Sequence, residues 1–135
     1  MSVSCVALDV EQAVAGFINT SPDGREFTVA NVNDYIMSLW NAGCGPIRLN
    51  FTQPQLRDFL GECCDVCLDR TAAGYKIDKS RLNTSGLTQR EREELGGGEQ
   101  RAQSFVLFCA LRVDLKTPDR LLDAMGFRFI YREPC

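Results

Sequence analysis

The chain has 135 residues, of which 44% are apolar and 24% are charged, a composition typical of one folded domain. Its 15 basic and 18 acidic residues give a net charge of −3, so there is no overall attraction for a polyanion. Histidine is absent, which excludes Ser-His-Asp and Cys-His catalysis and the zinc sites that use imidazole.

The N-terminal apolar run, residues 3–8, predicts neither a signal peptide nor a membrane anchor. No basic residue precedes it, and the acidic residues Asp9 and Glu11 end it. No window of the chain reaches the roughly 18 apolar residues that a spanning helix needs. Without an export signal, the seven cysteines are expected to be reduced thiols in the cytoplasm.

The first predicted helix covers residues 9–19. Asp9 is suited to the N-cap position, and Gln12 stands where a capping box places its second member. Apolar residues then recur at helical spacing and form one apolar face: Val10, Ala13, Val14, Phe17 and Ile18. Residues 21–24, Ser-Pro-Asp-Gly, predict a turn, and residues 25–29 predict a short strand.

A second helix is predicted over residues 30–42, followed by a strand at 46–51. Trp40 belongs to the apolar stripe of this helix, and we expect it to anchor the core rather than to stack on a ligand. The other residues of the stripe are Val32, Tyr35, Ile36 and Leu39. Gly43 occupies a position typical of a helix C-terminus. In the strand, apolar residues alternate with Arg48 and Asn50, which predicts that one face is buried.

The third predicted helix, residues 52–70, carries three of the seven cysteines. Thr52, Pro54 and Gln55 mark its start. Helical spacing places Cys63 and Cys67 in the apolar stripe. Cys64 lies at the border of that stripe and is the candidate reactive thiol.

The cysteines of this helix also suggest two kinds of chemistry, and the pattern argues against both. Cys44, Cys63, Cys64 and Cys67 would have to supply a zinc site, but three ligands on one helix fit tetrahedral geometry poorly. A thioredoxin-like redox motif would need its first cysteine at a helix N-terminus, whereas this C-x-x-C lies near the predicted helix end. We therefore expect no metal and no cofactor.

Residues 72–100 are predicted to form a connecting, flexible lobe. Tyr75 and Ile77 form either a short strand in it or a link to the core. A highly charged helix is expected at 88–95, next to a glycine hinge at 96–98. The helix has no core face, so its side chains are candidate partner-binding residues: Arg90, Glu91, Arg92 and Glu94.

The C-terminal part of the chain predicts a buried strand at 104–113, a helix at 117–126 and a last strand at 127–132. Leu121, Leu122 and Met125 are expected to face the core before Gly126 ends the helix. Arg128 and Arg132 share one face of the last strand and are further candidates for partner contact.

These elements predict a single α+β domain, residues 1–135, with about five helices packed on a small mixed sheet. The sheet is expected to contain 46–51, 104–113 and 127–132, in an order that the pattern does not determine. A parallel connection between the last two strands is one option, although its crossover is short.

Three classes of function are compatible with this sequence, of which we favour a non-catalytic module that binds another protein or a second copy of itself. An enzyme would need a carboxylate, lysine or thiol as its base, and none lies in a recognisable motif. A winged-helix-like nucleic-acid binder fits the helix order, but the third helix is acidic and would repel phosphates. The uneven charge supports association: residues 1–71 hold four basic and nine acidic groups, and 72–135 hold eleven and nine.

Overall fold

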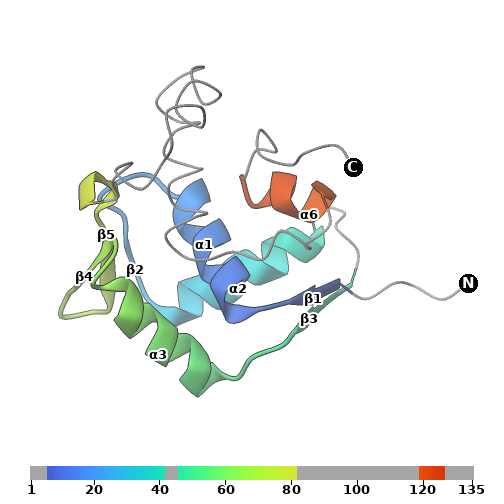
Figure 1. Ribbon diagram of the computed structural model, residues 1–135, viewed down its shortest axis with the longest axis horizontal. Helices are drawn as coiled ribbons and strands as arrows, with labels where there is room; N and C mark the ends of the chain where they lie inside the picture. Colours follow the sequence, from blue (N-terminus) through green and yellow to red (C-terminus); the bar gives the residue numbers. More distant parts are fainter. Residues whose placement is uncertain (1–5, 42–45, 82–118, 127–135) are drawn as a thin grey trace, which may run out of the picture.

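The computed structural model describes residues 6–41, 46–81 and 119–126 (Figure 1). The elements in chain order are β1 (Val6–Leu8), α1 (Val10–Thr20), β2 (Glu26–Phe27), α2 (Val29–Leu39), β3 (Ile47–Leu49), α3 (Gln53–Cys63), β4 (Leu68–Arg70), β5 (Tyr75–Ile77), the 3-10 turn η2 (Lys79–Arg81) and α6 (Asp119–Ala124). The fold is α+β, as predicted. The described part has four α-helices where about five were expected for the chain; the predicted helix 88–95 lies outside it.

Helix α1 is the centre of the fold and is buried around its whole circumference. Every residue from 12 to 18 is buried, including Gln12 and Gly16. The sequence predicts only one apolar face for this helix. The opposite side is also covered because Ala15 and Gly16 are small enough for neighbouring elements to approach closely: a Cβ atom on Gly16 would lie 2.8 Å from Cγ of Met125.

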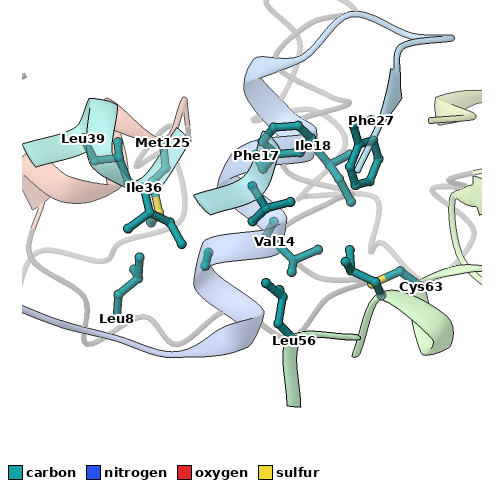
Figure 2. Packing of buried hydrophobic residues seen from close by; sticks show 14 of the residues in the cluster. Leu8, Val14, Phe17, Ile18, Phe27, Ile36, Leu39, Leu56, Cys63 and Met125 are labelled. Atoms are coloured by element: carbon teal, nitrogen blue, oxygen red, sulfur yellow. The ribbon is translucent and has the colours of Figure 1, made fainter. Parts of the chain in front are cut away.

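Helices α2 and α3, together with Met125 after α6, pack around α1. Figure 2 shows Leu56 and Cys63 of α3 on one side of Val14, and Met125, which follows α6, close to Ile36 and Leu39 of α2. Leu121, Leu122 and Met125 are fully buried, which confirms the core face predicted for the last helix. Residues near both ends of the described chain therefore share one core.

Side chains fix both ends of α1. At the start, the Asp9 backbone N–H donates to Oε1 of Gln12 at 2.8 Å, as the predicted capping box requires. At the end, Oγ of Ser21 donates to the Phe17 carbonyl at 2.7 Å. The predicted turn comes next, and Gly24 adopts a φ of 83° that favours glycine. The helix therefore begins and ends close to its predicted limits.

In the part of the chain that the structure describes, the strands form two small sheets, whereas one sheet was predicted. β1 pairs in parallel with β3, with Val6 opposite Ile47, and the antiparallel sheet has the order β2-β5-β4. β3 lies within the predicted strand 46–51, but its partner β1 was not predicted as a strand. The other predicted members, 104–113 and 127–132, lie outside the described residues.

The prediction that Trp40 anchors the core was wrong. Trp40 follows α2 directly and is 47% exposed. The buried residues of α2 are Val32, Ile36 and Leu39, which follow one line along the helix. Trp40 comes one residue after that line, and a rotation of about 100° carries it away from the core.

The Thr28 hydroxyl accepts from the Asn31 N–H at 3.4 Å and fixes the start of α2.

Helix α3 ends at Cys63, and the prediction that it continues to residue 70 was wrong. Residues 64–67 form a turn, and residues 68–70 form β4, which pairs with β5. Arg81 stabilises this change of direction: its Nη1 donates to the Cys64 carbonyl at 3.1 Å, and its Nη2 donates to the Leu68 carbonyl. The cross-strand hydrogen bonds of β4 thus replace the helical bonds that the sequence pattern predicts.

Two glycines are predicted to respond to alanine with opposite signs. A Cβ on Gly74 would overlap the Phe27 carbonyl oxygen, which the pairing of β2 with β5 holds in place. Gly74→Ala should therefore lower the free energy of unfolding by about 2 kcal/mol. A Cβ on Gly61, inside α3, meets only the flexible end of the Arg70 side chain at 3.0 Å. Gly61→Ala should raise the free energy of unfolding by roughly 0.5–1 kcal/mol.

Urea denaturation of the full chain measures both effects. An unchanged slope of the unfolding free energy with urea concentration would show that each variant unfolds as the wild type does. A Gly74→Ala protein as stable as the wild type would contradict the close approach of the two backbone segments.

Candidate binding groove and thiol cluster

A groove of about 450 Å³ lies between the first turn of α1 and the outer face of α3. Three segments supply its walls: the start of α1, the end of β3 and four positions along α3. The lining residues are Asp9, Val10, Glu11, Gln12, Asn50, Phe51, Gln55, Asp58, Phe59 and Glu62. Its volume is within the range of pockets that hold ligands or partner side chains.

The apolar part of the groove consists of Val10, Phe51 and Phe59. All three side chains are partly buried and pack against the core, so their exposed portions form a fixed apolar surface. Phe51 comes from the segment after β3, and Phe59 comes from the middle of α3. Two of its three members are therefore aromatic rings that come from different parts of the fold.

The polar part of the groove is acidic. Four carboxylates line it, from Asp9, Glu11, Asp58 and Glu62, and the lining contains no lysine or arginine. Over the described ranges, neither Asp58 nor Glu62 forms an ion pair, whereas Asp69 and Asp78 both pair with Arg81. Negative charge therefore accumulates around an apolar surface.

Local hydrogen bonds hold the groove in shape. Nδ2 of Asn50 donates to Oδ1 of Asp9 at 3.5 Å, and the Asn50 backbone N–H donates to the Leu8 carbonyl at 3.0 Å. The Thr52 N–H donates to Oε1 of Gln55 at 2.7 Å and fixes the first turn of α3. The residues after β3 are thus joined to the start of α1, and the protein's own hydrogen bonds fix the walls of the groove.

The carboxylates of the groove do not converge on one point. In the part of the chain that the structure describes, no three His, Cys, Asp or Glu side chains are placed to hold a metal ion. The groove consequently presents distributed negative charge rather than a coordination site.

The three described cysteines form a cluster at the end of α3. Cys63 and Cys67 are buried as predicted, and Cys64 is half-buried, with its Sγ donating to the Leu60 carbonyl at 3.5 Å. The C-x-x-C lies in the turn after α3, which corrects its expected position inside the helix. Its surroundings still differ from a helix N-terminus, where a thiol pKa would fall.

Burial determines the chemistry of the two inner thiols. It raises the pKa of Cys63 well above the ordinary range, and the neighbouring Cys67 adds to the effect. It also raises the pKa of Cys67 to about 12, although Arg81 counteracts part of the change. Both thiols are protonated at neutral pH and are therefore poor nucleophiles and poor metal ligands.

The remaining predicted site residues lie outside the described part of the chain. They are Arg90, Glu91, Arg92 and Glu94 of the expected charged helix, and Arg128 and Arg132 of the expected last strand. Their role in partner binding stays a prediction.

The groove was not predicted from the sequence, although part of the signal was present. Gln55, Asp58, Phe59 and Glu62 recur at the spacing of one helical face, and Phe59 is an aromatic residue among polar ones. The other wall could not be found in this way, because no local pattern indicates that the first turn of α1 lies beside α3.

The structure is a small α+β domain with an acidic groove between α1 and α3. No protein-family model matches the chain, and no match was found among curated proteins or solved structures. Within residues 6–41, 46–81 and 119–126, no helix has both the length and the hydrophobicity needed to cross a bilayer.

The thiol cluster predicts an order of reactivity. In the native chain, Cys64 should be alkylated at least ~10-fold faster than Cys63 or Cys67, because Cys64 is only half-buried and the other two are buried thiols with raised pKa values. A short pulse of iodoacetamide at mildly alkaline pH, followed by peptide mass spectrometry, measures the three rates. In guanidinium chloride the rates should converge. Fast native labelling of Cys63 would contradict its burial.

Proposed function

We propose that this protein is a non-catalytic interaction module that binds a segment of another protein in the groove between α1 and α3. The observation that carries the proposal is the combination of an apolar surface, Val10, Phe51 and Phe59, with a surrounding set of carboxylates in one preformed groove. An apolar surface bordered by polar groups is the usual composition of a protein interface.

The dimensions of the groove favour a short segment over a large flat interface. A volume of about 450 Å³ accepts one or two large side chains together with the backbone that carries them. The exposed parts of Phe51 and Phe59 would supply the apolar contact, in the way that aromatic residues dominate the binding energy of many interfaces. The carboxylates would then fix the orientation of the bound segment.

The thiols support a binding role over a thiol enzyme. Cys63 and Cys67 lie in the core with raised pKa values, and neither of them lines the groove. The three described cysteines are unpaired, in keeping with our proposal that the protein works in the cytoplasm.

Peptides selected from a random display library on the immobilised full chain test the proposal. Added to the isotope-labelled full chain, a selected peptide should shift the amide signals of groove residues such as Val10, Asn50 and Phe59. Phe59→Ala should weaken its binding by at least ~10-fold, since the aromatic contact is lost. Trp40→Ala removes an exposed aromatic side chain outside the groove and serves as the matched control.

A denaturation curve for each variant separates lost binding from lost folding. The wild-type shift map does not depend on any variant and remains informative if Phe59→Ala unfolds. Shifts confined to surfaces away from the groove would refute the proposal.

A further inference from the structure

We infer that the groove selects a cationic segment, one in which lysine or arginine residues flank a large apolar side chain. This inference rests on the proposed function and names the chemistry of the partner. No basic residue lines the groove, and Asp58 and Glu62 form no ion pair within the described residues, so a cationic segment would complement their charge better than a neutral or acidic one.

The position of the charges along α3 makes the inference more specific. Asp58 and Glu62 are four residues apart on α3 and therefore lie about one helical turn from each other. Like charges at this spacing repel each other, and within the described residues neither carboxylate forms an ion pair with a cation. A bound lysine or arginine between them would do so.

The two helices do not contribute equally to the negative potential. Asp9 and Glu11 stand at the N-terminus of α1, where the partial positive charge of the helix end offsets part of theirs. Glu62 stands in the last turn of α3, where the partial negative charge of the helix end adds to its own. The cations of the partner are therefore placed along α3, beside Asp58 and Glu62.

The apolar residues of the groove indicate that the partner segment also carries a large apolar side chain. Phe59 lies between Asp58 and Glu62 in sequence and lines the same groove as Phe51 and Val10. A leucine or phenylalanine next to the partner's basic residues would contact these side chains. A metal ion or a small polyamine would leave the apolar surface uncovered, which is why we assign a peptide segment.

A set of three synthetic peptides tests the inference. The probe is Lys-Lys-Leu-Phe-Lys-Lys, and its two controls replace every lysine with glutamine or with glutamate. Titrated into the full chain, the lysine peptide should bind at least ~10-fold more tightly than the glutamine peptide, and the glutamate peptide should not bind. Its affinity should fall several-fold between ~0.05 M and ~0.5 M salt, because screening weakens exposed charge pairs.

Variants of the protein show whether the groove carboxylates are responsible. Asp58→Lys combined with Glu62→Lys should abolish binding of the lysine peptide. Asp34→Lys combined with Asp65→Lys changes the net charge equally at two exposed carboxylates that do not line the groove, and should leave binding within ~2-fold. The milder pair Asp58→Asn and Glu62→Gln keeps the side-chain shapes and should weaken binding at least ~5-fold if the first pair disturbs folding.

Equal loss of binding in both lysine-substituted pairs would mean that only net charge matters, and would overturn the inference. The outcomes also separate it from the proposed function. If library-selected peptides shift the groove signals but contain no basic residues and bind independently of salt, the groove is a binding site and its preference for cations is refuted.

Discussion

The complete burial of α1 is the constraint on which the rest of the structure depends. A helix without a solvent-facing side must be covered from every direction. Here α2 and α3 pack against α1, and Met125, which follows α6, reaches Gly16. The burial of α1 depends on small residues in the helix as well as on large side chains around it. Gly16 allows Met125 to approach the α1 backbone, and Phe17 contacts Phe27 with ring centroids 4.8 Å apart. Segments far apart in sequence are thereby joined in one core.

The groove lies where the burial of α1 stops, at the N-terminal turn of the helix. The buried part of α1 starts at Gln12, so the preceding turn, with Asp9 and Glu11, remains accessible. α3 directs Leu56, Leu60 and Cys63 into the core and keeps Asp58 and Glu62 on its outer side. The same two helices that bury an apolar interface therefore present carboxylates at its margin. The core residues Leu56, Leu60 and Cys63 and the groove carboxylates Asp58 and Glu62 thus lie on opposite faces of α3.

Local signals in the sequence predict well where helices begin. They predict poorly which elements lie next to each other in the folded chain. The capping residues Asp9 and Thr52 mark α1 and α3 correctly, because a cap depends on residues within one turn. The end of α3 depends instead on Arg81, which lies 17 residues beyond Cys64. The pairing of β1 with β3 and the proximity of α1 to the outer face of α3 are likewise long-range, so neither the strand at Val6–Leu8 nor the groove could be predicted from periodicity.

The contact between α1 and α6 has a consequence for the order of folding. Nδ2 of Asn19 donates to the Met125 carbonyl across 106 residues of sequence, whereas the hairpin of β4 and β5 closes within a few residues. Closing so long a loop has a large entropic cost, so the contact forms after the local elements. During synthesis, the surface of α1 at Gly16 stays without this contact until Met125 has left the ribosome. Until then, part of the apolar surface of α1 lacks its native cover.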